Sequence, residues 1–224
     1  GLGLSENDIS LGAVDVLKKC DDIYCEFYTA RWNGQIENIE NIINKKIRLL
    51  QREEVESDFL INNAKKRNIA LLIPGDPLTA TTHFQLILDA KNADVECKVI
   101  HAPSIYTAVA KSGLHLYKFG RTITLTRERV SSPYDMIREN RKSGLHSLVL
   151  LDIDMSAEEG VELLLKNKSI TEKRKIVVCT NLGTERSEIK YLPANKINSK
   201  TIPTVLILPG KLNFKEEEAL ELWK

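Results

Sequence analysis

Short apolar runs alternate with segments of helical periodicity through the first half of the chain. Continuous short apolar runs predict buried strands, and apolar positions that recur every three or four residues predict helices. Strands are predicted at 22–27, 46–50, 69–73 and 95–101, and helices at 11–20, 36–43, 54–67, 84–92 and 104–111. Strict alternation of this kind favours a parallel sheet with crossover helices.

The pattern changes at 112–120, SGLHLYKFG, where two glycines and mixed polarity predict a domain boundary. We therefore expect an N-terminal domain at 1–114 and a C-terminal domain at 115–224. A short strand at 188–192 would make the second sheet mixed. The expected fold class is α/β, with two α/β domains built on a parallel and a mixed sheet. The other elements predicted in the second domain are strands at 121–126, 147–152, 175–180 and 204–208, and helices at 134–142, 157–166 and 215–223.

The stretch 69–83, IALLIPGDPLTATTH, contains the most informative turn. A Pro-Gly-Asp-Pro turn directly after a buried strand removes two backbone donors and permits a positive φ at Gly75. The hydroxyls of Thr79, Thr81 and Thr82 can then cap a helix or bind a ligand. Because ligands bind at the carboxyl ends of strands in open α/β sheets, we expect a site here. A plain tight turn is the alternative.

Composition argues against several classes of function. The chain has 32 Lys and Arg against 31 Asp and Glu, a formal net charge of +1, so a nucleic-acid-binding protein is not indicated. No apolar run approaches the roughly 20 residues of a membrane span. Four scattered cysteines, without a CxxC pair, favour small buried residues in a reducing compartment over a metal site or disulfide framework. We expect a soluble cytoplasmic protein that binds neither nucleic acid nor membranes.

The remaining polar positions give weaker signals. GLGL at 1–4 is typical of a strand-to-helix turn, although the sequence does not include the strand expected before it. Further turns of this type are predicted at 102–105, where Ser104 is a ligand contact or an N-cap, and at 151–154. Neither a nucleophile elbow nor an HExxH motif occurs. Each histidine is expected to be structural, and His83 is the main candidate for another role because it closes the central turn. No catalytic residue is assigned.

Eight segments of the chain stand in the order found in one enzyme family, and together they span nearly its whole length. On these segments the chain resembles the diphthine synthases, which belong to the tetrapyrrole methylase superfamily. The GDP turn alone would indicate only the superfamily, whereas ATTH and HAPSIY narrow the resemblance to this family. The segments are GLGL at 1–4, EFYT at 26–29, REEVE at 52–56, PGDPLTATTH at 74–83, VIHAPSIYTAV at 99–109, GLHLYKFG at 113–120, LLDI at 150–153 and PGKL at 209–212.

The resemblance implies an activity, a cofactor and partners. The implied methyl donor is S-adenosylmethionine, with S-adenosylhomocysteine as its product. The implied substrate is translation elongation factor 2, whose modified histidine, 3-amino-3-carboxypropyl-histidine, is methylated repeatedly on its amino group during diphthamide biosynthesis. The resemblance also implies a homodimer with the cofactor in a cleft between the two α/β domains.

Matched position by position, the resemblance also implies cofactor contacts at three turns of the first domain and at strand ends of the second. The chain departs from the family at two of them, because relatives usually have His at position 204 and Ala at position 180. The stretch 126–134 is also unusually short. The implied contacts are Leu4, Asp76, Thr79, Ser104, Ile105, Leu151, Thr180 and Thr204.

Two other functions remain open on the sequence alone. Another tetrapyrrole-type methylase, acting on a corrinoid or on ribosomal RNA, would share the GDP turn and the cofactor. A non-catalytic nucleoside-binding module would bind the cofactor without turnover. Near-neutral charge argues against the RNA substrate, whose binding depends steeply on salt.

Overall fold

A three-stranded parallel sheet forms the centre of the first of two compact units in the computed structural model, which describes residues 1–128 and 130–224. The first unit is Gly1–Tyr106 and the second is Thr107–Lys224. The domain ranges expected from the sequence, 1–114 and 115–224, stay a prediction. Arg129, within the short stretch 126–134, lies outside the described residues.

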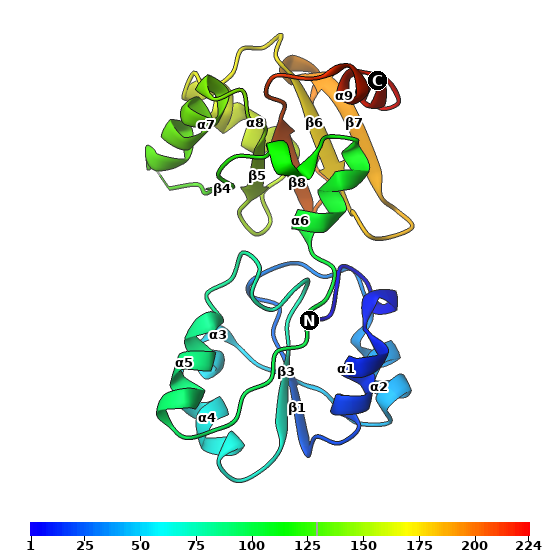
Figure 1. Ribbon diagram of the computed structural model, residues 1–224, viewed down its shortest axis with the longest axis vertical. Helices are drawn as coiled ribbons and strands as arrows, with labels where there is room; N and C mark the ends of the chain where they lie inside the picture. Colours follow the sequence, from blue (N-terminus) through cyan, green and yellow to red (C-terminus); the bar gives the residue numbers. More distant parts are fainter. Residues whose placement is uncertain (129) are drawn as a thin grey trace. The chain divides into compact units, whose positions relative to one another are not determined.

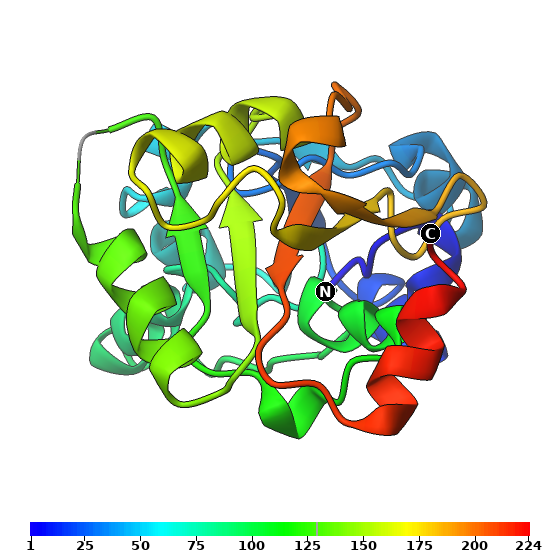
Figure 2. The same cartoon turned by 90° about the horizontal axis from the view of Figure 1, so that it is seen from above.

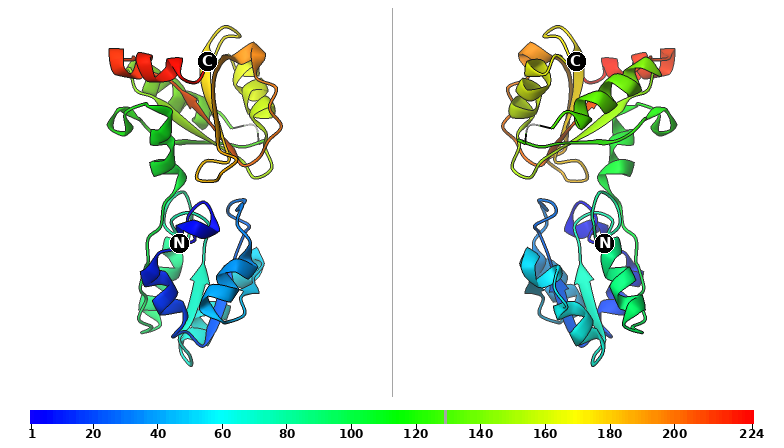
Figure 3. Two further views of the ribbon diagram at one scale, coloured as in Figure 1. Left: turned by 90° about the vertical axis from the view of Figure 1, so that its right-hand side faces the viewer. Right: turned by 90° about the vertical axis from the view of Figure 1, so that its left-hand side faces the viewer.

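The sheet of the first unit has the order β2-β1-β3, and both strand pairs are parallel, as predicted. In the register, Cys25 of β1 lies between Leu49 of β2 and Leu72 of β3. The N-terminal segment lies beside the carboxyl end of β3, where Gly3 and Gly75 form an isolated antiparallel bridge (Figure 3). The strands are β1 (Asp22–Cys25), β2 (Arg48–Leu49) and β3 (Ile69–Leu72).

Helices cover both faces of this sheet, with α1 and α2 on one side and α3, α4 and α5 on the other (Figure 1). Side chains of a strand alternate between the two faces. Ile23 and Cys25 therefore pack with α1 and α2, whereas Tyr24 packs with Val55 and Leu60 on the opposite face. The helices are α1 (Leu11–Leu17), α2 (Ile36–Ile43), α3 (Arg52–Val55), α4 (Phe59–Ala64) and α5 (Phe84–Asn92), with the 3₁₀ helix η1 (Glu6–Asp8) before them.

Two predictions for the first unit are wrong. The helix expected at 54–67 is divided, because the Ser57 hydroxyl donates to Glu54 O (2.9 Å) and accepts from Phe59 N–H (3.2 Å), which ends one helix and begins the next. The strand expected at 95–101 does not form. Val95 N–H donates to Ala90 O of α5 (2.9 Å) and the Gly1 amino group donates to Ile100 O (2.7 Å), and these two bonds do not make a ladder.

A five-stranded mixed sheet forms the centre of the second unit, in the order β4-β5-β8-β6-β7. β4 and β5 are parallel, and the other three pairs are antiparallel. The opposite directions of β5 and β8 can be followed in Figure 2. The mixed sheet and the added strand β7 are as predicted. The strands are β4 (Ile123–Leu125), β5 (Ser147–Leu151), β6 (Lys175–Thr180), β7 (Glu188–Pro193) and β8 (Thr204–Leu208).

The core of the second unit lies between this sheet and two of its helices. Ile137 of α7 and Val161 and Leu164 of α8 pack against the fully buried Val149 and Leu206 of the sheet. The helices are α6 (Ile105–Ala108), which spans the division between the units, α7 (Ser132–Lys142), α8 (Ala157–Lys166) and α9 (Phe214–Glu221), with the 3₁₀ helices η2 (Val109–Ser112), η3 (Leu116–Lys118) and η4 (Ala194–Lys196).

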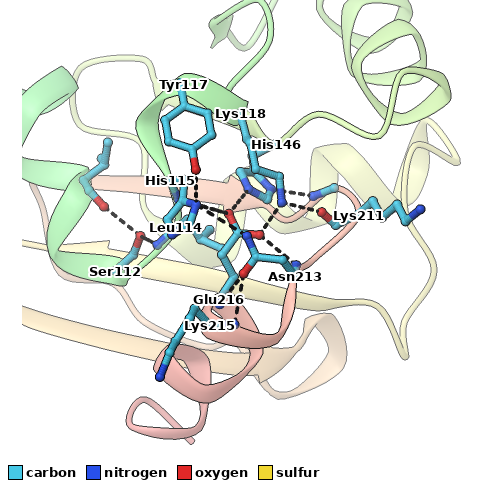
Figure 4. A network of polar contacts seen from close by, with 12 residues as sticks. Ser112, Leu114, His115, Tyr117, Lys118, His146, Lys211, Asn213, Lys215 and Glu216 are labelled. Atoms are coloured by element: carbon cyan, nitrogen blue, oxygen red, sulfur yellow. Dashed lines mark hydrogen bonds and ion pairs between the residues drawn. The ribbon is translucent and has the colours of Figure 1, made fainter.

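A buried carboxylate, that of Glu216, connects three segments of the second unit (Figure 4). Its Oε1 accepts from His115 N–H (3.1 Å) and His146 Nε2 (2.9 Å), and its Oε2 accepts from Asn213 N–H (3.0 Å) and from the Lys118 ammonium. Burial opposes the charge, but these four donors outweigh it and lower the pKa of Glu216 to about 2. His146 is neutral, because its Nδ1 accepts from Gly210 N–H (2.8 Å).

The structure shows the state of the four cysteines and the length of the helices. All four thiols are free, and Cys20, Cys25 and Cys179 are buried as expected. Cys97 is exposed, which contradicts the prediction, because the segment around it does not enter the sheet. In the described part of the chain, no helix is long and apolar enough to cross a bilayer.

Candidate functional site

Three turns meet at the carboxyl end of the first sheet, and the first of them is the N-terminal segment. Leu2 N–H donates to Ile73 O (2.8 Å), and Gly3 and Gly75 exchange two hydrogen bonds of 3.1 and 2.8 Å. Gly3 has φ +71°, and a Cβ there would lie 2.1 Å from Asp8 Cβ. Glycine is therefore required at position 3 for the first turn to reach the second.

The Asp76 carboxylate joins the second turn to the third. Its Oδ1 accepts from Leu78 N–H (3.0 Å) and the Thr79 hydroxyl (3.2 Å), and its Oδ2 accepts from Ala102 N–H (3.3 Å) and His101 Nδ1 (2.7 Å). Burial opposes ionisation, yet the bonds from Leu78, His101 and Ala102 lower the pKa of Asp76. The carboxylate is therefore charged and holds two turns from distant parts of the sequence together.

The third turn presents Ser104 and Ile105 next to the second. A Cβ built on Gly75, which has φ +66°, would lie 4.0 Å from Ser104 Cα. Ser104 is buried, and Ile105, the first residue of α6, is half-buried. Leu4 is half-buried in the first turn, and its N–H donates to Asp8 Oδ2 (2.8 Å). The structure thus brings together the turns that carry the five first-unit residues expected to contact a cofactor.

A second buried carboxylate, Glu26, lies at the same end of the sheet, directly after β1. It accepts from Thr29 through both its N–H (3.1 Å) and its hydroxyl. His83, which precedes α5, places Nε2 3.2 Å from Glu26 Oε1, and its ring stacks on Tyr28 at a centroid distance of 6.0 Å. His83 is 4 % exposed, and this contact, whose geometry is not that of a hydrogen bond, packs the end of the 74–83 segment against the loop after β1.

The three expected residues of the second unit lie side by side on adjacent strands. Thr180 of β6 pairs directly with Thr204 of β8. Leu151 is one position beyond the Leu150–Val205 pair, which places it across from Thr204 on β5. The Thr204 hydroxyl donates to Thr201 O (2.6 Å), and the Thr180 hydroxyl donates to Glu188 O (3.5 Å). Both threonine oxygens are buried, and each can still accept a hydrogen bond.

Sequence reasoning missed two residues that build the site. His101 was expected to be structural, without a named partner, and its side chain, which is 70 % exposed, bonds to Asp76. Its position directly before the Ala-Pro-Ser turn was the available signal. Glu26 begins the EFYT segment at 26–29 and was given no role. The signal for it was a single acidic residue directly after an apolar strand.

Comparisons with known proteins agree on one family. The family model of tetrapyrrole (corrin/porphyrin) methylases matches residues 1–197. The chain is 41 % identical to the diphthine synthase of Methanococcus aeolicus over 99 % of this chain and 95 % of that protein. It is 40 % identical to the diphthine synthase of Methanocaldococcus jannaschii, over 99 % and 96 %.

A solved structure supports the same assignment. A crystal structure of diphthine synthase superposes with a TM-score of 0.94 at 32 % identity, covering 100 % of this chain and 93 % of that one. The sequence and the fold therefore point to the same group of methyltransferases. The chain belongs to the tetrapyrrole methylase family and, within it, to the diphthine synthases.

Proposed function

We propose that this methyltransferase moves methyl groups from S-adenosylmethionine to the amino nitrogen of 3-amino-3-carboxypropyl-histidine in translation elongation factor 2, repeatedly, as a step of diphthamide biosynthesis. The similarity to diphthine synthases along nearly the whole chain supports the substrate. One structural observation supports the proposal most strongly. The turns around Leu4, Asp76 and Ser104, which are far apart in the sequence, meet at the carboxyl end of one parallel sheet.

The residues at these turns fit the chemistry of the proposed cofactor. S-adenosylmethionine supplies an electrophilic methyl group on a positively charged sulfur. Leu4 and Ile105 offer half-buried apolar surface next to main-chain polar groups, and the charged Asp76 gives this region a negative potential. Leu4, Thr79, Ser104 and Ile105 would hold the cofactor from the first unit, with Asp76 acting through the turn that it stabilises, and Leu151, Thr180 and Thr204 would hold it from the second.

Asp76 acts through the turn that it stabilises. Both of its oxygens already accept two hydrogen bonds, so its carboxylate has little capacity left for a direct bond to a ligand. Its role is to fix the main chain at 76–79 and 101–104. The protein then aligns a neutral amine for in-line attack and excludes water, and no residue needs to form a covalent intermediate.

The proposed partners follow from this substrate. Elongation factor 2 is the protein substrate, the enzyme acts as a homodimer in the cytoplasm, and neither nucleic acid nor a membrane takes part. The near-balanced charge of the chain supports the absence of a nucleic-acid partner.

Incubation with methyl-labelled S-adenosylmethionine tests the proposal. Label is expected on elongation factor 2 that carries the 3-amino-3-carboxypropyl group, and not on the unmodified factor. Label on ribosomal RNA or a corrinoid would instead favour another member of the superfamily. Cofactor binding without transfer to any acceptor would favour a nucleoside-binding module. The Asp76→Asn variant should bind the cofactor more weakly, and native binding by this variant would contradict the role of the turn.

A further inference from the structure

A small pocket opens at the end of the second sheet where β5 begins and β8 ends. Its cavity is about 10 Å³, enough for one water-sized atom. Arg141, Ser147, Ser169 and Arg174 give it polar lining. This is the end of the strands opposite to Leu151, because β5 runs from Ser147 to Leu151. The pocket is therefore separate from the residues proposed to hold the methyl donor.

Ser169 lines this pocket, and its buried hydroxyl has no hydrogen-bond partner among the described residues. The residue is 6 % exposed. Its main-chain N–H is already bonded to Leu164 O (3.0 Å). The other hydroxyl, that of Ser147, accepts from Asn140 Nδ2 (3.0 Å). Buried hydroxyls are nearly always satisfied, so Ser169 calls for a partner from outside the chain.

Two arginines meet at the same pocket without a carboxylate. Arg174 is half-buried and donates from Nη2 to Pro209 O, a single bond among residues 1–128 and 130–224, although a guanidinium has five N–H donors. Arg141 is exposed at the end of α7. Across the described ranges 1–128 and 130–224, neither arginine forms an ion pair, whereas Arg138 on the same helix pairs with Asp135 and Arg121 pairs with Glu139.

The two guanidiniums raise the positive potential at the pocket. Burial, followed by the charge of Arg141, lowers the pKa of Arg174. Lys142 follows Arg141 in the chain, and Lys173 and Lys175 flank Arg174. Cations in the last turn of a helix are often explained by the helix dipole, which would account for Arg141 and Lys142. It does not account for Arg174, which precedes a strand.

We propose that this pocket binds a phosphate group, either as free phosphate or as a phosphate monoester. One oxygen enters the pocket and accepts the hydrogen of the Ser169 hydroxyl. Two others lie at the mouth, where the guanidiniums of Arg141 and Arg174 donate to them. The planar fork of a guanidinium matches two oxygens of such a group, and the cavity admits one oxygen but not a whole anion.

This site can be tested by calorimetric titration of the full chain with inorganic phosphate, phenyl phosphate or acetate. The ionic strength is held constant with a chloride salt. We expect saturable binding of both phosphates and not of acetate. Arg141→Gln, on the surface, and Arg174→Gln should each weaken phosphate binding about tenfold, because each removes charge-assisted hydrogen bonds. Ser169→Ala should weaken it less, because it removes one neutral donor.

Arg186→Gln is the matched control. It removes the same charge from an exposed arginine of the second unit, in the turn after β6, and should leave phosphate binding unchanged. Because Arg141 is exposed, its substitution should leave the fold intact, which thermal unfolding can verify. Absence of saturable binding, equal loss in the control, or acetate binding as tight as phosphate would each overturn the proposal. Binding of phenyl phosphate but not free phosphate would identify a monoester as the ligand.

Discussion

Glu216 offers the sharpest test of the forces that stabilise the second unit. Its side chain is fully buried and accepts hydrogen bonds from His115, His146, Lys118 and Asn213. The Glu216→Gln variant keeps the shape of the side chain. It replaces one acceptor oxygen by an NH₂ group, which cannot accept the hydrogen bonds that this oxygen received. It also removes the negative charge that pairs with the Lys118 ammonium. We therefore expect a large loss of stability from an isosteric change.

Two independent estimates give the size of this loss. The pKa of Glu216 lies at about 2 in the folded chain against an ordinary value of 4.5, a difference of about 2.5. At about 1.4 kcal/mol per pKa unit, the charged form contributes about 3 kcal/mol to folding at neutral pH. Removing one partner of a buried ion pair typically destabilises by about 3–5 kcal/mol. The expected loss at pH 7 is therefore about 3 kcal/mol.

The sign of the pH dependence follows from the lowered pKa. The contribution of Glu216 is fully present above about pH 4.5 and is lost as the pH falls towards 2, because the unfolded chain then binds a proton that the folded chain binds less readily. The difference between the native chain and Glu216→Gln should accordingly shrink between pH 5 and pH 3. The other carboxylates contribute equally to both proteins and cancel in this difference.

Urea unfolding monitored by tryptophan fluorescence can measure the effect in the second unit alone. The chain has two tryptophans, and in a Trp32→Phe background the signal comes from Trp223, whose Nε1 donates to Ser112 O (3.0 Å). Glu217→Gln, the next and exposed residue of α9, is the matched control and should change stability by no more than about 0.5 kcal/mol. A Glu216→Gln loss below about 1 kcal/mol at pH 7, or one independent of pH, would refute this reasoning.

Three further predictions concern the first unit. Gly3→Ala should lower the stability of the chain by about 2 kcal/mol or more in thermal unfolding, because Gly3 has a positive φ and a Cβ there would collide with Asp8. Gly12→Ala, in the exposed part of α1, is the control and should be neutral or stabilising by up to about 1 kcal/mol. Asp76→Asn should raise the Kd for S-adenosylmethionine about tenfold in calorimetry, because an amide cannot accept from all four donors, and unchanged binding would contradict the positioning role. His83→Phe should lower stability by about 1–3 kcal/mol, because it removes the polar ring nitrogen next to the buried Glu26 carboxylate. Adding Glu26→Gln should then recover part of that loss, and additive losses would show that the two side chains do not interact.

Local sequence signals predicted most elements because those elements combine periodicity with clear end signals. α2, α5, α8, β6 and β8 have the predicted bounds, and each is bounded by turn or capping residues, such as Ser156 before α8. The failures depend on interactions outside the segment. Ser57 divides a helical pattern by its own hydrogen bonds, and 95–101 has strand composition but lacks a partner ladder. Composition cannot show whether a neighbouring strand is present.

The candidate site shows a different limit. Family motifs indicated Asp76, Thr79, Ser104 and Leu4, but the sequence did not show what the Asp76 side chain contacts. The Gly-Asp-Pro turn required only that a polar group sit at the end of a strand. His101 and Ala102 become partners of Asp76 because the third turn folds back beside the second, a long-range contact that no local pattern encodes.

The hydrogen bonds of Asp76 also explain why an acidic residue occupies position 76. A direct contact to a cationic cofactor would need a carboxylate with free lone pairs, whereas Asp76 uses each oxygen twice within the protein. Its lowered pKa keeps it charged without a ligand, so the turns are organised before binding. Asp76→Asn should therefore loosen the 101–104 turn even in the absence of cofactor. Hydrogen exchange at Ala102 N–H measures this directly, and native protection in the variant would mean that the carboxylate serves the ligand and not the fold.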